Sequence, residues 1–477
     1  MRRRVLSVAL VLFAATLPSA HALEAAATKI DITPDLAVEK TYMAGFGATG
    51  RRPKGAHDPL YARLVVLREG KTTVAVVGLD LLGFYLNETR DLEDQWRGGD
   101  QSKHLFLSAT HAHSGPDTLG LWGPMIGVSG VNPRYQARIK NKIAESLKSL
   151  ENQLRPATAA GGHGFLDPRG LCRDSRDPQV IDPNLAVLRV TALDRKAVVT
   201  IVNWSCHPEI LGRDNLLLTA DYPGPLCERI EKKTGGECLF LVGAIGGLMT
   251  PDVQVENFDE MKRIGTEVGD AALALKTAPG KGGLGFISES VRIPVENSRY
   301  RLFLPALSFG HRISTIDGRE ISKIGTWLLS LRHLIFGLNQ TNQPWVMSTV
   351  TVLDIGPARL LGMPAEIFPE LAIGGYDGRY AYGRPVVAVD NPNPPALNTA
   401  PKGPYLRDKI SAPVPMLVGL VNDELGYLVP EYDFKVRTSK SMLPRLPGHY
   451  EETNSIGPSA TRLLTAAAAR LLKEPRP

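Results

Sequence analysis

Short apolar runs alternate with amphipathic helical patterns along most of this chain, and this alternation constrains the fold more than any other feature. The runs at 60–67 and 72–79 are joined by a turn and predict a β-hairpin. At 134–150, Ile139 and Ile143 begin an apolar repeat with the spacing of one helix face. Because strands keep alternating with helices, the sequence predicts an α/β fold with mixed β-sheets and flanking helices. Further strands are expected at 105–109, 185–190, 197–202, 239–242, 346–355, 359–363 and 414–420, and further helices at 223–233, 258–276 and 459–473.

The composition is that of an ordinary globular chain. Its 477 residues are 43% hydrophobic and 22% charged, which is enough apolar material for a large core. The net charge of +6 is mild, and half of it comes from Arg2, Arg3 and Arg4. Such a charge argues against nucleic acid as a partner and permits weak attraction to an anionic lipid surface.

The first 22 residues have the pattern of a signal peptide. Three arginines precede an apolar stretch at 5–17, and Ala20-His21-Ala22 fits a small-x-small cleavage site. The apolar stretch is too short to span a bilayer, which takes roughly 20 residues. We therefore expect a secreted or periplasmic protein with a signal peptide at 1–22. For 23–477 we expect a single domain, because the sequence contains no convincing linker or internal repeat.

Two segments in the second half resist a simple assignment. The segment 302–338 is rich in Leu and Ile but is broken by polar residues. Core helices, a lid, or an apolar surface that contacts lipid all fit this pattern. A long irregular loop is expected at 374–410, where Gly, Pro, Asn and Tyr are frequent, and long loops within a domain are often functional.

Two histidines follow the strand expected at 105–109. His111 and His113 are at i and i+2, so on an extended backbone their side chains point to the same face. Gly115-Pro116 then forces a turn, which puts the histidines at the end of the strand. Two imidazoles so placed can share a metal, or one can hold the metal while the other moves protons. The alternative is a pair of solvated loop histidines.

Three more residues with metal-binding or proton-carrying side chains lie just after apolar strands. They are His207, Glu366 and Tyr427. Sites in α/β sheets gather outside the carboxyl ends of the strands. The separations are too long for a zinc finger and suit a catalytic zinc site, which takes a few protein ligands and keeps one position open for water. Each residue also has an ordinary structural interpretation, and it is their shared placement that favours a metal site.

These residues lie within motifs that resemble a known family. The motifs are Thr110-His-Ala-His-Ser-Gly-Pro116, Asn203-Trp-Ser-Cys-His-Pro208, Pro364-Ala-Glu366, Gly426-Tyr427 and His449-Tyr-Glu451, in that order. The set is similar to the neutral/alkaline non-lysosomal ceramidases. The resemblance covers about residues 28–472, and two N-terminal stretches, 45–47 and 60–63, also match.

The resemblance implies a zinc ion held by His111, His207, Glu366 and Tyr427, with His113 beside it as the proton-handling histidine. Zinc lowers the pKa of a bound water from about 16 to near 7 and polarises a carbonyl oxygen. In the mechanism that the resemblance implies, the zinc-bound hydroxide attacks the amide carbonyl. His113 then protonates the leaving amine, since a bare amide anion is a prohibitively poor leaving group.

The sequence also departs from the family on the substrate side. The family has a polar glycine-rich turn ending in Ser-Pro, and here Thr250 takes the place of the serine while Leu248 and Met249 make the turn more apolar. Arg173 corresponds, in a loosely aligned stretch, to a family arginine near the scissile bond. With His113, Thr250 and Arg173 are therefore the expected catalytic residues. Full-length ceramidases also carry a C-terminal immunoglobulin-like domain, and for this sequence we expect the catalytic domain alone.

The predicted function is that of an exported zinc-dependent amidase that hydrolyses the N-acyl bond of ceramide or a related lipid amide. Peripheral membrane contact is one interpretation of the apolar segment 302–338. Three alternatives remain: a zinc hydrolase of another N-acyl amide or ester, a non-catalytic lipid-binding relative with a structural metal, and a serine hydrolase using Ser114 or Ser205. The last lacks a G-x-S-x-G motif.

Overall fold

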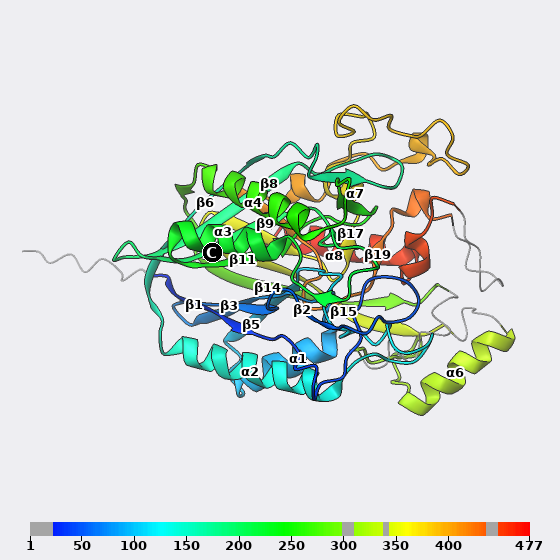
Figure 1. The fold of residues 1–477 in the computed structure, drawn as a ribbon, viewed down its shortest axis with the longest axis horizontal. Coiled ribbons are helices and arrows are strands. Elements are labelled where there is room, and N and C mark those ends of the chain that lie inside the picture. Colours follow the sequence, from blue (N-terminus) through cyan, green and yellow to red (C-terminus); the bar gives the residue numbers. More distant parts are fainter. Residues whose placement is uncertain (1–21, 298–309, 337–342, 436–446) are drawn as a thin grey trace, which may run out of the picture.

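The fold is α/β, as predicted, with a large mixed β-sheet and helices on its outer faces (Figure 1). This computed structural model describes residues 22–297, 310–336, 343–435 and 447–477. The signal peptide expected at 1–22 lies outside these residues, apart from Ala22.

The large sheet has nine strands. Strands β4 and β5 pair in parallel, as do β9 and β11, and the other neighbours are antiparallel. The order is β11 (Glu237–Val242), β9 (Ala197–Trp204), β8 (Asn184–Ala192), β6 (Arg155–Phe165), β1 (Glu24–Asp31), β3 (Tyr61–Glu69), β4 (Thr72–Leu79) and β5 (Lys103–Ala109), with β13 (Ala278–Pro279) beside β6.

Two pairs of helices cover this sheet. Helices α1 (Leu86–Arg97) and α2 (Pro133–Glu151) pack on β1 and β3–β5, whereas α3 (Pro223–Thr234) and α4 (Phe258–Ala274) pack on β8, β9 and β11 (Figure 1). The periodic apolar residues of α2 are buried, as expected for a helix that lies on a sheet. Asn132 caps the start of α2 by accepting hydrogen bonds from two backbone N–H groups.

A second sheet packs against the inner face of the first. Its order is β14 (Leu284–Pro294), β15 (Trp345–Ile355), β16 (Ala358–Gly362) and β18 (Val414–Val418), and helix α8 (Pro458–Leu471) covers its other face. Leu241 and Val76 from the first sheet meet Leu353 and Met416 from the second in one buried core. Both faces of the central strands are therefore buried, which explains their nearly continuous apolar sequences.

The remaining elements lie outside the two main sheets. They are the strand pairs β2 (Gly55–Ala56) with β10 (Leu217–Leu218), β7 (Cys172–Asp174) with β12 (Met249–Pro251) and β17 (Glu366–Ile367) with β19 (Tyr427–Leu428), the helices α6 (Lys323–Phe336) and α7 (Pro369–Ile373), and 3-10 turns at Leu397–Thr399, Arg407–Lys409, Glu431–Asp433 and Glu451–Asn454.

The helices and strands predicted from the sequence are confirmed, with ends that differ by up to two residues. The segment 374–410 is irregular apart from short 3-10 turns, as expected. Of the expected apolar segment 302–338, the first eight residues and the last two lie outside the described residues, and 323–336 form α6. Among the described helices, none has the length and apolar character needed to cross a membrane.

Candidate metal centre

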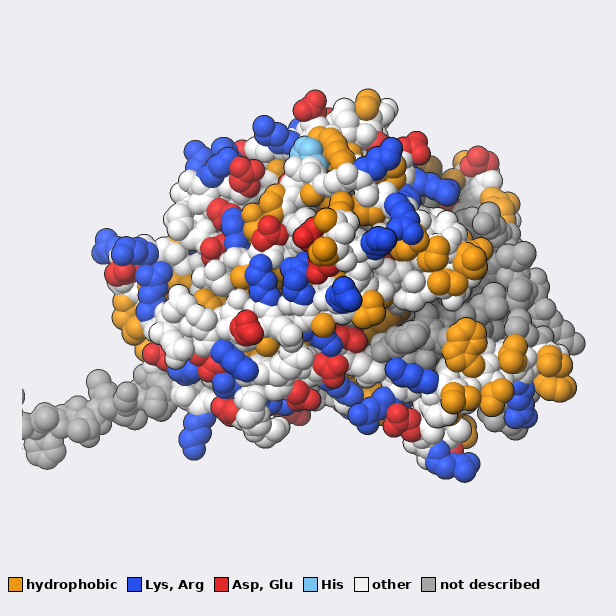
Figure 2. Space-filling model, turned by 60° about the horizontal axis from the view of Figure 1, so that its bottom comes forward, with side chains coloured by type: hydrophobic (Ala, Val, Ile, Leu, Met, Phe, Trp, Pro, Cys, Tyr) orange, Lys and Arg blue, Asp and Glu red, His pale blue; other side chains and the backbone are white. Residues whose placement is uncertain are grey.

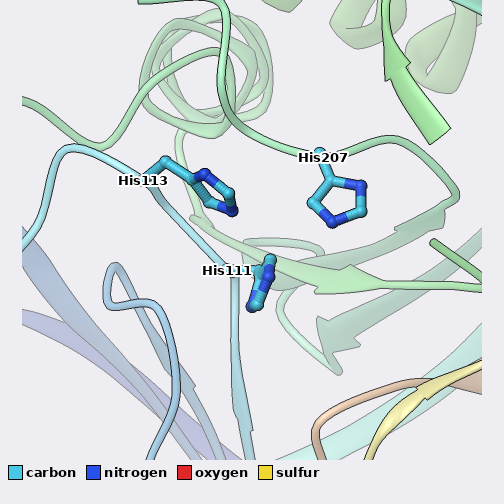
Figure 3. A group of neighbouring side chains, drawn as sticks. All are labelled: His111, His113 and His207. Carbon is cyan, nitrogen blue, oxygen red and sulfur yellow. The ribbon is translucent and has the colours of Figure 1, made fainter. Parts of the chain in front are cut away.

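Three histidines meet just beyond the carboxyl ends of β5 and β9. His111 and His113 follow β5 and His207 follows β9, and one ring nitrogen of each lies within 4.8 Å of the others (Figure 3). His111 has a left-handed backbone conformation with φ of 69°, which a non-glycine residue adopts only when its surroundings enforce it. Its backbone N–H donates to the carbonyl oxygen of Leu81 at 2.9 Å, which holds this turn. Two distant segments are thus fixed around one point.

Backbone contacts orient two of the three rings. Nδ1 of His111 lies 2.7 Å from the carbonyl oxygen of Leu82, and Nδ1 of His207 lies 3.0 Å from that of Met249. A carbonyl oxygen only accepts hydrogen bonds, so each Nδ1 carries the proton and each Nε2 presents a lone pair. Metal-bound histidines are held by their second nitrogen in the same way.

Glu366 brings a carboxylate to these lone pairs. Its Oε2 lies 3.0 Å from Nε2 of His207 and 3.7 Å from Nε2 of His111. Without a proton or a cation between them, these atoms are acceptors that repel each other. A divalent cation satisfies all of them at once, and neutral imidazole with carboxylate is a donor set that suits zinc. The residues therefore fit the predicted metal.

Tyr427 stands next to Glu366. Strands β17 and β19 are parallel, and their register pairs Glu366 with Tyr427. The tyrosine side chain is buried, and this burial, together with the negative charge of Glu366, holds the pKa of Tyr427 well above its usual value. A cation at this point would offset the cost of placing the carboxylate and the phenol together.

His113 is the third imidazole, and its ring lacks hydrogen bonds. Neither of its buried ring nitrogens has a hydrogen-bond partner, although Nδ1 lies 3.3 Å from Oε2 of Glu209. Buried polar atoms without partners are costly and mark a place where a ligand or a proton acts. The ring packs on Gly45, where a Cβ atom would come within 2.6 Å of its Cγ. Gly45 also has φ of 98°, a left-handed conformation that favours glycine. The similarity of residues 45–47 to the ceramidase motif therefore has a structural cause.

Two of the three imidazoles, those of His111 and His113, favour the neutral form. Burial, together with the neighbouring His207, lowers the pKa of His111 to about 4. Burial and the two neighbouring histidines also lower the pKa of His113 well below its ordinary value. Burial opposes a charge on His207, but the carboxylate of Glu366 raises its pKa. Neutral histidine is the ligating form.

The two remaining predicted residues, Thr250 and Arg173, lie on the neighbouring pair of short strands. They are directly opposite each other in the antiparallel pair of β12 and β7, so their side chains share one face. The hydroxyl of Thr250 donates a hydrogen bond to the buried carboxyl of Glu209, and the charge of Arg173 also acts on that carboxyl.

Glu209 is the site residue that the sequence analysis missed. It combines contacts to His113 and Thr250 with burial, which raises its pKa. The signal was present, because Glu209 follows His207 at the same i, i+2 spacing as the predicted histidine pair. The structure groups His111, His113 and His207 with Glu366. Tyr427 is adjacent to Glu366 in the strand register, and Glu209 lies between His113 and the pair formed by Thr250 and Arg173.

The serine alternative finds no support in the same region. The hydroxyl of Ser205 donates to the carboxylate of Asp182 at 3.1 Å and accepts from the backbone N–H of Ala244. Ser114 accepts a hydrogen bond from the side chain of Asn215 at 3.0 Å. Neither contact is the serine–histidine pair that an activated nucleophile needs.

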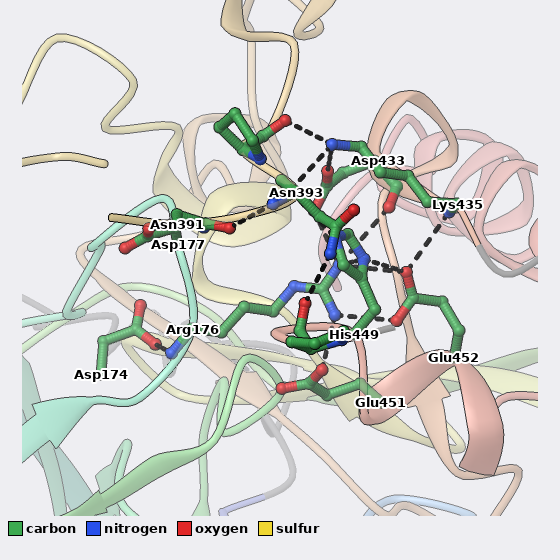
Figure 4. A network of polar contacts seen from close by, with 12 residues as sticks. Asp174, Arg176, Asp177, Asn391, Asn393, Asp433, Lys435, His449, Glu451 and Glu452 are labelled. Carbon is green, nitrogen blue, oxygen red and sulfur yellow. Dashed lines mark hydrogen bonds and ion pairs between the residues drawn. The ribbon is translucent and has the colours of Figure 1, made fainter. Parts of the chain in front are cut away.

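A buried ion-pair network around Arg176 lies beside Phe368, which contacts Tyr427 (Figure 4). Arg176 donates to Glu451 at 2.5 Å, to Glu452 at 2.9 Å and to Asp433 at 2.7 Å. His449, from the same motif as Glu451, lies 2.6 Å from Glu452, the residue that follows the motif. The His449–Glu451 motif thus closes this network. The guanidinium also lies 5.2 Å from the ring of Phe368, which contacts Tyr427 edge-on.

Comparison with known proteins finds similarity to neutral ceramidase. No family model matches the chain. The neutral ceramidase of Pseudomonas aeruginosa is 24% identical over 213 residues, which are 41% of this chain and 32% of that protein, so the alignment spans about a third of the relative. The crystal structure of the Pseudomonas aeruginosa neutral ceramidase superposes with a TM-score of 0.64, at 16% identity, over 96% of this chain and 76% of that one. A structure described as a ceramidase complexed with C2 superposes with a TM-score of 0.63, at 16% identity, over 94% and 75%.

Proposed function

We propose that this chain, a relative of the neutral ceramidases in sequence and in fold, is a zinc-dependent amidase that cleaves the N-acyl bond of ceramide or a related lipid amide. The observation that carries the proposal is the meeting of His111, His207 and Glu366, with a third imidazole, at one buried point. Export is part of the proposal and rests on the pattern at 1–22.

His111, His207, Glu366 and Tyr427 would hold the zinc. When bound at such a site, zinc acidifies a water molecule and polarises a carbonyl oxygen. The protein contributes fixed ligand orientation, since the Nδ1 atoms of His111 and His207 are tied to backbone carbonyls and the phenol is set beside the carboxylate by strand register.

His113 would move the proton. Its Nδ1 faces Glu209, so its Nε2 is the atom left to take a proton from the attacking water and to pass it to the amide nitrogen as the amine departs. Thr250 and Arg173, on the face of β12 and β7 beside Glu209, would bind the polar part of the substrate. In this arrangement Glu209 is a positioning residue that acts through His113.

Replacing Glu209 with glutamine tests that role. The amide keeps the shape of the side chain but removes the negative charge that positions His113. We therefore expect kcat to fall about 10- to 100-fold, which is less than the full contribution of a general acid, and KM to change little. Zinc content should stay at the wild-type level. The control is Glu267→Gln, which alters an exposed glutamate on α4. An unchanged kcat, or a loss of zinc in place of a loss of turnover, would contradict a positioning role, and partial recovery in Glu209→Asp would support it.

A substrate panel tests the proposed function itself. The purified, zinc-loaded chain is incubated with ceramides of several acyl lengths, N-acyl amino acids and simple carboxylic esters, and the released fatty acid is measured. We expect the lipid amides to be hydrolysed fastest. Preference for an N-acyl amino acid or an ester would favour the alternative, a zinc hydrolase with a different substrate. The apolar Leu248 and Met249, in the turn before Thr250, are the departure from the family that motivates this alternative. Hydrolysis of none of them would overturn the enzymatic proposal.

A further inference from the structure

Helix α6 exposes an apolar face, and we propose that this face docks on an anionic lipid surface. The face, called the α6 face below, consists of side chains that are 54–75% exposed: Ile324, Trp327, Leu328, Leu331, Ile335 and Phe336. They recur at the spacing of one side of a helix. Figure 1 shows α6 projecting from the edge of the molecule, and Figure 2 shows hydrophobic side chains gathered on this projection.

The orientation of α6 is the reverse of that of an ordinary surface helix. Thr326, Ser330 and His333, which lie at i, i+4 and i+7, are buried, while the six apolar side chains of the α6 face point outward. A helix that only covers a core turns its apolar side inward. Contiguous exposed apolar surface of this kind marks a site of contact with a protein or a membrane.

The charges of α6 favour a lipid surface over another protein. The helix contains Lys323 and Arg332 and no Asp or Glu. Cationic residues beside Trp, Leu and Phe are the composition of helices that lie in the interface of an anionic bilayer. At 14 residues, α6 is about 21 Å long, which is too short to span a bilayer and suits a helix lying in its plane.

Helix α6 is anchored close to the metal centre. His311, twelve residues before the start of the helix, lies 2.7 Å from the carboxylate of Asp423, which is four residues before Tyr427. Ile313 packs in the same core as Leu425 and Leu428, and Ile321 and Leu329 pack against it. These contacts connect the segment that leads into α6 with the segment that carries Tyr427. A role of the α6 face in reaching a lipid substrate rests on the proposed function, whereas the docking itself does not.

The test is vesicle binding by the full chain. Vesicles of phosphatidylcholine with phosphatidylglycerol, and of phosphatidylcholine alone, are prepared without any amide lipid, and co-sedimentation is measured. We expect binding to the anionic vesicles and a blue shift of Trp327 emission that the Trp327→Phe variant lacks. Leu331→Ser combined with Ile335→Ser should weaken binding about 10-fold or more, since each substitution removes a buried leucine-sized contact. Leu193→Ser combined with Val389→Ser, which alters exposed apolar residues elsewhere, should bind like the wild type.

Three results would overturn the docking proposal. Equal vesicle binding by the Leu331/Ile335 variant and the wild type, or no binding by the wild type, would overturn the proposal. So would a concentration-dependent dimer, seen by light scattering, that the same variant abolishes, because the α6 face would then be an interface between two copies. Hydrolysis of a short-chain soluble amide should be unchanged in the variant. Vesicle binding without any hydrolysis would refute the proposed function and leave the docking surface standing.

Discussion

Replacing His207 with alanine is expected to remove the bound zinc and the hydrolytic activity together. The ring is fully buried, its Nδ1 is committed to the backbone of Met249, and its Nε2 is the atom nearest to Glu366. Removal of a partner outside the ligand shell already costs about 10- to 100-fold in metal affinity or activity, and loss of a ligand exceeds this. Zinc content by elemental analysis and turnover of a short-chain ceramide should therefore both fall to background.

The control for this variant is His163→Ala, which removes an exposed histidine hydrogen-bonded to Asn184. It should keep wild-type zinc content and turnover. Circular dichroism of both variants establishes that the fold is retained. A His207→Ala chain with one equivalent of zinc and normal turnover would show that the metal, if catalytic, is bound elsewhere.

Replacing Arg176 with methionine is expected to cause the largest loss of stability. The guanidinium is 2% exposed and is shared by three buried carboxylates, on Asp433, Glu451 and Glu452. Methionine keeps the apolar volume but leaves these carboxylates without their cation, and breaking a buried pair costs about 3–5 kcal/mol. The midpoint of thermal unfolding should therefore fall markedly. Arg379→Met, which breaks an exposed pair with Asp377, should leave the thermal midpoint nearly unchanged.

The pH dependence of the Arg176 variant gives a second measurement. Burial opposes the charge of Glu452, but His449 and Arg176 hold its pKa at about 2. A lowered folded-state pKa stabilises the fold above the ordinary glutamate value of about 4.3, and this contribution is lost as the pH falls through the folded-state value. The gap in thermal midpoint between wild type and Arg176→Met should therefore narrow from pH 5 towards pH 2. A constant gap, or a loss no larger than that of Arg379→Met, would contradict the role given to this network.

The centre of the site was predictable because its residues obey local rules. The i, i+2 spacing of His111 and His113, and the position of His207 after an apolar strand, are visible in the sequence. Glu366 and Tyr427 follow β16 and β18, which are parallel, so their two segments leave the sheet at the same edge. The spacing of Glu209 from His207 was visible in the sequence, but the role of Glu209 follows only from its contacts with His113 and Thr250 across the fold.

Other elements could not be predicted from the sequence because tertiary contacts determine them. Strand β6 was not predicted because its glycines weaken the strand pattern, yet the fold requires them. A Cβ at Gly162 would lie 2.1 Å from the carbonyl oxygen of Lys276, and one at Gly161 would lie 2.8 Å from Val414. The orientation of α6 was equally out of reach, because an apolar helix is normally expected to face the core. The structure shows that six apolar side chains of α6 are exposed, which the sequence pattern did not indicate.

The central claim is that amide hydrolysis depends on a metal held by these residues, and one measurement addresses it directly. Fatty-acid release from ceramide is followed with the purified chain before chelation, after removal of the metal, and after one equivalent of zinc is restored. The account predicts that release stops in the metal-free sample and returns with zinc. Undiminished release by the metal-free chain would contradict it.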